Sequence, residues 1–564
     1  MSMEPRKLFL IPLGFAYRIF GGMANSFSKK FGLNDAILRS GLRISPQGYC
    51  SIFLFIISFI ILPVSIIFSC IIFLCNLSLL LFIVPILLIL ISIIFLYVFP
   101  LIKSSMRSNG VWSELPIIST YFSILGLSHV PIYRGFEKLV SQNIFPWFKF
   151  ESELFFIDYM FFSRDPLVSI KNLISNHPCK DFRDYLDSYV RYVESGGYPA
   201  DFLLDYSSKL SDRFSHEFKR FSEDASLFGD IIISLFVFLP LGLISMFIIM
   251  NPISSLSWLR LYGFILSPII TILIFVVVDS NQLKFPFNFG RYKRLFLISF
   301  LGSILITTIC NIFSLDFPSL FTLSVTSLLA PPCLLYEFDI RKAKLLELNL
   351  PKFVRDISES IKVGLSIEDA MVLMEKNSYG STLNGIIRKI NRSLSFSLTS
   401  VSEIFNEIIS GINSWFAKAT FWLIGEAIST GGGRSEVFSH LSKFCEDYYY
   451  FKHKVESELR IYTLIGYSSS IMLLFVVSQL IKFLNISLFG WSVPFNIVPN
   501  ITSFDKELSS ILVDTIYSVI TFLSFLIGIL VGKVSGGTIF SGFKHALICC
   551  YICILGIYGV SSLW

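Results

Sequence analysis

The sequence predicts an all-α polytopic membrane protein, and two observations lead to that prediction. Of the 564 residues, 54% are hydrophobic and 15% are charged, and the mean hydropathy of +0.70 is too high for a soluble chain of this length. Two polar segments, Glu114 to about Leu227 and Asn349 to Arg460, also carry short motifs that recur in the same order. We therefore expect two duplicated cytosolic helical-bundle domains between groups of transmembrane helices.

About nine apolar runs are long enough to cross about 30 Å of hydrocarbon. They lie at about 51–75, 78–102, 231–250, 261–278, 295–313, 319–335, 461–481, 515–531 and 546–560. The expected organisation is a basic leader (1–50), transmembrane helices 1–2 (51–102), the first cytosolic domain (103–227), transmembrane helices 3–6 (228–336), the second cytosolic domain (337–460) and transmembrane helices 7–9 (461–564).

The placement of basic residues predicts the orientation of the chain in the cell membrane. Lys and Arg gather in the leader and in the connector after the fourth predicted span, and such clusters stay on the cytosolic side. The basic residues of interest are Arg39, Arg43, Lys284, Arg291, Lys293 and Arg294. With the N-terminus and both polar domains in the cytosol, nine crossings place the C-terminus outside.

Apolar residues in the two polar segments recur at intervals of three and four, which predicts helices. Leu115-Pro116 and Leu350-Pro351 are expected to open the first helix of each copy. The recurring residues are Pro116 and Pro351, Gly126 and Gly364, the doublets Gly196-Gly197 and Gly431-Gly432, and the acids Glu223 and Glu458. Gly364 predicts a helix stop, and Ser366 with Asp369 predicts the start of the next helix.

Each recurring group has two interpretations. The glycines are expected in tight turns that need a positive φ, and the alternative is a hinge or a corner that contacts a partner. The two acids are expected on a solvated helix face. Their alternative is a contact with a basic partner or an intramolecular salt bridge.

The chain shows no pattern that is typical of catalysis, cofactor binding or metal binding. Six histidines are scattered without metal-ligand spacing. The ten cysteines contain one CxxC spacing, Cys550 to Cys553, and we expect these two side chains to pack inside the last span. The phosphate-loop lookalike Gly528–Val534 lacks the Ser or Thr that would hold magnesium. The net charge of +6, without a basic stripe in the polar domains, also gives no sign of a nucleic-acid partner.

The repeated Leu-Pro, Gly-Leu-Ser and Gly-Gly motifs, each set followed by a membrane helix, resemble the type II secretion system F family. Its members are the platform proteins of type IV pili, type II secretion, Tad pili and archaella. The leader segment 37–46 and the glycine-rich tail, 532–537 with 542–545, are similar to the archaeal branch. One departure is Gly425-Glu426, which stands farther upstream of Gly431 than the corresponding pair in bacterial platforms.

The resemblance implies a non-enzymatic platform for an archaellum, an adhesive pilus or another pilus-like filament. It implies that a cytosolic hexameric ATPase docks on the inner face and that pilin-like or archaellin-like subunits arrive through the membrane. The six basic residues named above are the candidates for ATPase docking, and contact with anionic lipid is their alternative role. A homodimer would match a symmetric motor. A solute transporter permease and a non-catalytic membrane receptor or scaffold remain open as other functions.

Overall fold

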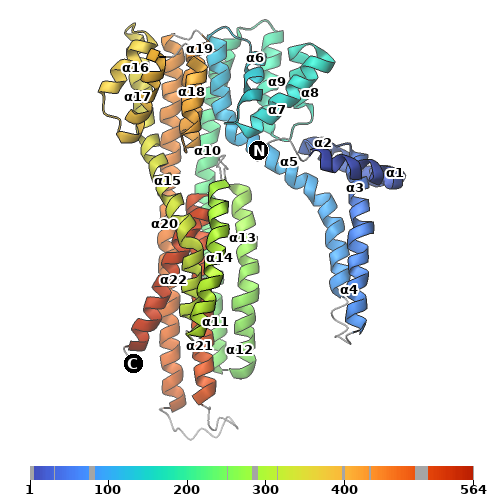
Figure 1. The fold of residues 1–564 in the computed structure, drawn as a ribbon, viewed down its shortest axis with the longest axis vertical. Coiled ribbons are helices and arrows are strands. Elements are labelled where there is room, and N and C mark those ends of the chain that lie inside the picture. Colours follow the sequence, from blue (N-terminus) through green and yellow to red (C-terminus); the bar gives the residue numbers. More distant parts are fainter. Residues whose placement is uncertain are drawn as a thin grey trace. The chain divides into compact units, whose positions relative to one another are not determined.

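The fold was analysed in a computed structural model, which describes residues 6–30, 32–42, 44–74, 83–249, 252–282, 290–313, 316–396, 401–430, 434–489 and 506–562. These residues form helices and turns and contain no β-strand, as the sequence predicts. The chain divides into two units, 1–207 and 208–564, and the boundary falls inside one long helix (Figure 1).

The first unit contains a leader, a pair of long apolar helices and a helical bundle. Its helices are α1 (Arg6–Lys30), α2 (Leu33–Ser40), α3 (Pro46–Ile56), α4 (Leu62–Leu74), α5 (Ile83–Leu127), α6 (Ile132–Ser141), α7 (Pro146–Asp158), α8 (Pro166–Ser175), α9 (Lys180–Glu194) and the start of α10 (Pro199–Ile233). The π-helical turn η1 (Ile57–Ile61) joins α3 to α4, and η3 (Tyr159–Ser163) extends α7. Proline stands in the first turn of α3, α7 and α8, where its fixed φ suits a helix and its missing N–H costs nothing.

The bundle α6–α9 packs on the end of α5 through a continuous aromatic core. The ring centroids of Phe122 and Phe136 are 5.1 Å apart, and those of Phe136 and Phe155 are 4.7 Å apart. Phe148 meets Phe182 edge to face at 5.4 Å. All five side chains are fully or almost fully buried, so this region has its own hydrophobic core.

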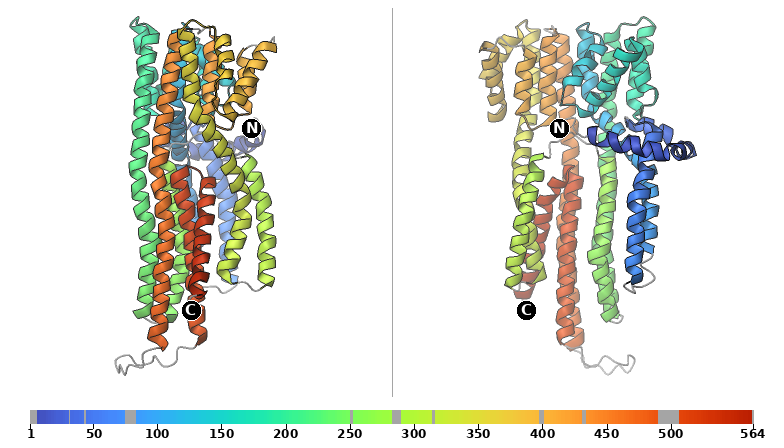
Figure 2. Two further views of the ribbon diagram at one scale, coloured as in Figure 1. Left: turned by 90° about the vertical axis from the view of Figure 1, so that its left-hand side faces the viewer. Right: turned by 45° about the vertical axis from the view of Figure 1, so that its right-hand side comes forward.

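The second unit contains the end of α10, six long or joined helices and a second bundle. Its helices are α11 (Leu239–Ile249), α12 (Pro252–Leu261), α13 (Ser267–Asn281), α14 (Gly290–Ile312), α15 (Phe317–Lys362), α16 (Ile367–Lys376), α17 (Ser381–Phe396), α18 (Val401–Ser410), α19 (Trp415–Ser429), α20 (Ser435–Phe489), α21 (Lys506–Gly536) and α22 (Ile539–Ser562). The π-helical turns η4 (Ser234–Phe238) and η5 (Tyr262–Leu266) join α10 to α11 and α12 to α13. The helices α15, α20, α21 and α22 pack against one another, and α16–α19 lie at one end of them (Figure 2).

Local signals set the start of the second bundle as the sequence predicts. The helix α15 ends at Lys362, and Gly364 follows with a φ of 94°, which confirms the predicted helix stop. The Ser366 hydroxyl accepts a hydrogen bond of 3.1 Å from the backbone N–H of Asp369 and so caps α16. Inside the bundle, the ring of the fully buried Phe353 meets that of Tyr379 at 5.7 Å.

The helices of the two bundles begin at a constant separation along the chain. The pairs α6 and α16 begin at 132 and 367, α7 and α17 at 146 and 381, α8 and α18 at 166 and 401, and α9 and α19 at 180 and 415. Each pair is therefore 235 residues apart.

Eight helical segments among the described residues are long and apolar enough to cross a membrane. They are Pro46–Ile67, Pro199–Leu243, Ser257–Ser280, Gly290–Ile312, Phe317–Lys362, Ser435–Gln479, Val513–Gly536 and Ile539–Gly559. Each contains or overlaps one of the nine predicted runs. The remaining run, 78–102, begins in residues outside the described part of the chain and continues as the first part of α5.

Three residues expected at turns or helix starts lie inside helices instead. Pro116 is internal to α5 and Pro351 is internal to α15, so the Leu-Pro pairs do not begin helices. An internal proline costs about 3 kcal/mol, and the apolar face of α15 offsets this cost because Leu350 and its neighbours are buried. Gly126 also lies in α5, where a Cβ would approach the Cα of Ala200 at 3.2 Å. Close packing, and not a positive φ, explains that glycine.

The glycine doublets have different outcomes. Gly196 has a φ of 79°, which confirms the predicted turn. The neighbouring Gly197 is not in the positive-φ region, and a Cβ there would lie 2.3 Å from the ring of Tyr192. Gly431 and Gly432 lie outside the described residues.

Candidate functional site: charged contacts of the bundles and the connector

The described residues form neither a metal site nor a phosphate-binding loop. No group of three His, Cys, Asp or Glu side chains gathers there in a way that could hold a metal ion. The phosphate-loop lookalike is helical, and a Cβ on Gly528 or Gly532 would meet the backbone of Ala546 or Gly542 at 2.4 and 2.3 Å. These glycines therefore allow α21 and α22 to pack closely and do not form a phosphate loop.

A buried ion pair joins the first bundle to α5. Arg107 on α5 donates two hydrogen bonds, of 2.7 and 2.6 Å, to the carboxylate of Glu151 on α7. The side chains are 6% and 0% exposed. Arg107 also donates to the backbone carbonyl of Arg39 at 3.1 Å, so the same guanidinium holds the end of α2. One side chain thus connects the leader, the long helix and the bundle.

His177 completes this buried group. Its Nδ1 accepts a hydrogen bond of 3.1 Å from the backbone N–H of Cys179, which leaves the proton on Nε2. That Nε2 lies 3.3 Å from Glu151. Burial raises the pKa of Glu151, but the hydrogen bonds and the charge of Arg107, together with the nearby imidazole of His177, outweigh burial and hold the pKa below its ordinary value. The carboxylate therefore stays ionised and paired.

A second buried acid fixes the start of α7. Glu114 accepts hydrogen bonds from the backbone N–H groups of Phe148, at 2.8 Å, and Trp147, at 3.3 Å. Burial raises the pKa of Glu114 to about 8, although these two hydrogen bonds oppose the shift. A proton can therefore bind here near neutral pH, at the junction of α5 and the bundle.

The second bundle is joined to the long helices by different residues. Glu347 on α15 accepts a hydrogen bond of 2.7 Å from Lys452 on α20 and another from Ser414, the N-cap of α19. Nearby, Lys344 pairs with Glu456 at 2.8 Å. Because α15 supplies the acid in one pair and the base in the other, sliding α15 along α20 would break both pairs or bring like charges together. The contacts therefore fix the register of the two helices.

A third group of contacts surrounds the glycine-rich connector between α21 and α22. Lys533 donates to Asp279 on α13 at 2.7 Å and to the carbonyl of Gly537 at 2.8 Å. Lys544 on α22 donates to Glu337 on α15 at 3.0 Å. The connector is therefore held by ion pairs to two other helices of the second unit.

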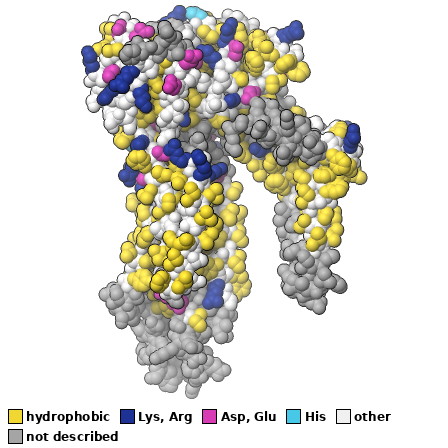
Figure 3. All heavy atoms as spheres, viewed as in Figure 1, with side chains coloured by type: hydrophobic (Ala, Val, Ile, Leu, Met, Phe, Trp, Pro, Cys, Tyr) yellow, Lys and Arg dark blue, Asp and Glu magenta, His cyan; other side chains and the backbone are white. Residues whose placement is uncertain are grey.

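The structure places most of the predicted docking residues on exposed surface. Arg291, Lys293 and Arg294 lie in the first turn and a half of α14, around the buried Tyr292, which hydrogen-bonds to Asp339. In Figure 3, Lys and Arg side chains gather at the end of the apolar surface of the long helices in this unit. Arg39 is exposed at the end of α2 in the first unit. Arg43 and Lys284 lie outside the described residues.

The two recurring acids lie on solvated helix faces. Glu223 is on α10, 3.8 Å from Lys219, and both side chains are about two-thirds exposed. Glu458 is exposed on α20. An exposed ion pair of this kind contributes little to stability, so these two acids stabilise the fold less than the buried pairs do.

Sequence reasoning missed the buried pairs because their members are far apart in the chain. Arg107 and Glu151 are separated by 44 residues, and Glu347 and Lys452 by 105. The only local signal is Glu114, which stands directly before the Leu-Pro motif.

The chain was also compared with known protein families, curated proteins and solved structures, and none of them matches it.

Proposed function

We propose that this chain is the cell-membrane platform of a type IV pilus-like filament, an archaellum or an archaeal pilus. In this role it couples a cytosolic hexameric ATPase to the insertion of pilin-like subunits. The bundles α6–α9 and α16–α19 are the two copies of a duplicated cytosolic domain, among nine membrane helices, with the N-terminus in the cytosol and the C-terminus outside. The constant separation of 235 residues between 132 and 367, and between 180 and 415, supports the duplication.

The observation that carries the proposal is that each bundle is followed by an unbroken helix that becomes a membrane-length apolar segment. The series α10, η4 and α11 is continuous from Pro199 to Ile249, and α20 runs from Ser435 to Phe489. At 1.5 Å per residue, the 55 residues of α20 span about 80 Å. A helix of this length has no flexible joint between its polar and apolar parts. A force on the polar end therefore moves the apolar end, as a platform requires.

The buried charges support the same role. Arg107 with Glu151 holds α7 of the first bundle against α5. Glu347 with Lys452 joins α15 to α20, and Glu347 also accepts a hydrogen bond from the N-cap of α19 in the second bundle. A paired charge in a buried position resists displacement because separation would leave an uncompensated charge. Motion of a bundle is therefore transmitted to the long helices, because these contacts do not give way. The exposed basic turn of α14 offers a surface for an acidic patch on the motor.

If the chain were a solute transporter, polar groups that bind the solute should lie within the membrane-spanning helices. In the second unit, the ion pair of Lys533 with Asp279 instead joins the ends of α21 and α13. This placement favours mechanical coupling. The receptor or scaffold alternative differs in that it requires no ATPase.

The test is affinity capture of the tagged full-length chain from its native membrane in gentle detergent, followed by mass spectrometry. We expect a secretion-type ATPase and pilin-like subunits among the retained proteins. Recovery of neither, together with solute uptake into vesicles that contain the purified chain, would replace the platform with the transporter. Recovery of pilin-like subunits without an ATPase would favour the scaffold.

Charge reversal locates the docking surface in the same experiment. The variant R291E/K293E/R294E should insert normally and lose the ATPase. The matched control R388E/K389E/R392E reverses three exposed charges on α17 of the same unit and should retain it. Loss of the ATPase in the control alone would move the docking surface to the second bundle and leave the platform function in place.

A further inference from the structure

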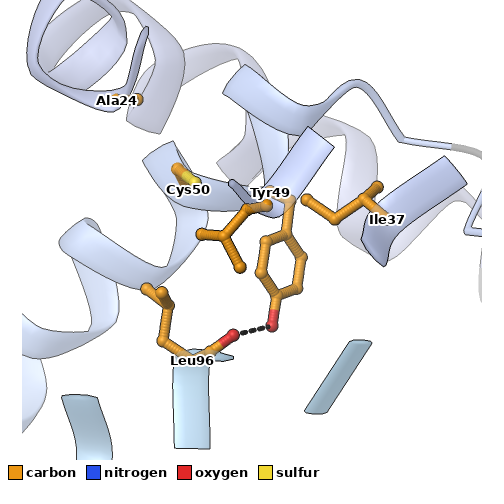
Figure 4. Packing of buried hydrophobic residues seen from close by; sticks show 6 residues of the cluster. Ala24, Ile37, Tyr49, Cys50 and Leu96 are labelled. Atoms are coloured by element: carbon orange, nitrogen blue, oxygen red, sulfur yellow. Dashed lines mark hydrogen bonds between the residues drawn. The ribbon is translucent and has the colours of Figure 1, made fainter. Parts of the chain in front are cut away.

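The leader helix α1 is fixed to the beginning of the first apolar helix. A buried cluster forms where α1, α2, α3 and α5 meet (Figure 4), and it consists of Ala24, Leu33, Ile37, Tyr49, Cys50 and Leu96. The Tyr49 hydroxyl donates to the carbonyl of Leu96 at 2.9 Å. In the first turn of α3, Gln47 accepts from Tyr17 at 3.1 Å and donates to Asn25 at 3.2 Å. The helix α1 therefore crosses α3 near its N-terminal end, as Figures 1 and 2 show.

Two neighbouring sides of α1 are apolar, and only one of them is covered. Ala16 and Ala24 are buried on the side that faces α3. Phe15, Ile19 and Met23, which recur every four residues and so share one side, are 58%, 48% and 68% exposed. An uncovered apolar stripe of this kind marks a contact surface, because water disfavours it.

This stripe continues onto the surface of the first candidate membrane span. The ring of Phe15 meets that of Phe55 edge to face, with centroids 6.1 Å apart, and Phe55 stacks on Phe59 at 4.7 Å. Phe59 is 56% exposed within the segment Pro46–Ile67. On a membrane span, lipid covers an exposed side chain such as Phe59. The same layer of lipid would then lie next to Phe15.

The polar side of α1 carries only positive charge. Arg18 and Lys29 are eleven residues apart, about three helical turns, so they share a side, and Lys30 ends the helix. The sequence of α1 contains no acid. Long basic side chains can reach sideways to the headgroup layer while their stems stay on apolar surface.

From these contacts we propose that α1 lies in the surface layer of the bilayer, with Phe15, Ile19 and Met23 in lipid and its basic residues on anionic headgroups. This inference goes beyond the platform function and does not depend on it. The occupant is a bilayer and not a protein because the stripe is continuous with a membrane span, and its charge matches anionic lipid.

The first test measures depth on two opposite sides of α1 in the full-length chain in vesicles. Met23→Cys places a fluorophore on the stripe, and Gly14→Cys places it on the opposite side, one turn before Arg18, where a new Cβ meets no atom within 4 Å. Eight of the ten native cysteines are buried, and replacing the other two, Cys70 and Cys75, by Ser lets the new thiol react preferentially. Quenching by lipids that carry a spin label at the top of the acyl chain should be several-fold stronger at position 23 than at 14. Equal quenching at both positions would overturn the proposal.

The second test addresses the headgroups. Quenching of the label at Met23→Cys is compared between spin-labelled phosphatidylglycerol and spin-labelled phosphatidylcholine. The anionic lipid should quench more strongly, and the preference should vanish in the variant R18E/K29E/K30E. The same preference in both proteins would overturn the role of the basic residues. Quenching by both lipids that persists in the variant would show that the apolar stripe still lies in the membrane and that the variant is folded.

Discussion

The two bundles share their helix spacing but not their charged contacts. In the first, Arg107 and Glu114 on α5 are buried and contact α7. The residues 235 positions later, at 342 and 349, are Lys342 and Asn349. Lys342 is exposed, with its Nζ 4.2 Å from the ring centroid of Phe338, and Asn349 donates to the carbonyl of Leu345 in its own helix. Neither repeats the contact made in the first bundle.

This difference shows that local sequence signals determine the helix boundaries, whereas long-range packing determines the buried charged contacts. Helix boundaries depend on prolines, caps and turns within a few residues, and the helix starts have the same spacing in both bundles. Buried pairs depend on side chains that meet only after folding, and these differ. Under the platform proposal, the first bundle is tied to the leader through the carbonyl of Arg39, and the second is tied to α20 through Lys452. The two bundles therefore pass force to different helices.

The largest effect is expected at the buried pair of the first bundle. Arg107→Met preserves volume but leaves the carboxylate of Glu151 buried without its main partner, which should cost about 3–5 kcal/mol. Lys452→Met in the second bundle should cost about 1–3 kcal/mol, because Glu347 keeps its hydrogen bond from Ser414. Amide hydrogen exchange of the full-length chain measures both. Equal loss of protection in α6–α9 and α16–α19 would remove the proposed difference between the joints.

The next effect concerns pH and should appear only in the first bundle. The pKa of Glu114 is about 8 in the folded state and 4.5 for an ordinary carboxyl, so the folded state binds the proton more tightly between these values. The free energy of unfolding should therefore fall, on the order of a few kcal/mol, as the pH rises from about 5 to about 8. Glu114→Gln should remove this slope.

The second bundle provides the control for this pH effect. Asn349→Asp places an acid at the matching position, which is only half-buried, so it should introduce no comparable slope. Hydrogen exchange at several pH values, corrected for the intrinsic exchange rate, gives the free energies. A slope that survives in Glu114→Gln would assign the pH effect to another group.

A smaller effect should distinguish two helical glycines. Gly126→Ala in α5 brings a Cβ to 2.9 Å from a methyl group of Leu203 and to 3.2 Å from the Cα of Ala200, and should cost about 1–3 kcal/mol. Gly385→Ala in α17 meets no atom within 4 Å and should stabilise its helix by up to about 1 kcal/mol. Opposite shifts in thermal unfolding are expected. Stabilisation by both substitutions would show that the contact of α5 with α10 is loose.

The sequence predicts the elements of this fold better than their connections. The helical stop at Gly364 and the cap at Ser366 follow from neighbouring residues and are confirmed. Pro116 was predicted to open a helix and lies inside one, because tertiary packing outweighs the lost hydrogen bond. The pairing of Arg107 with Glu151 could not be predicted, since nothing local relates residues on two different helices.

The smallest effect compares the turn that follows α5 with the turn that follows α15. The residue 235 positions before Gly364 is His129, and Gly364 and His129 both occupy the left-handed region, with φ of 94° and 58°. Gly364→Ala should cost about 1–2 kcal/mol because a Cβ is disfavoured there. His129→Gly relieves that strain but loses the contact of the imidazole with Tyr198, at 3.1 Å, and adds freedom to the unfolded chain. We expect these terms to cancel to within about 0.5 kcal/mol in thermal unfolding. A cost as large as that of Gly364→Ala would mean that the contact between His129 and Tyr198 holds the first turn in the left-handed conformation that glycine provides in the second.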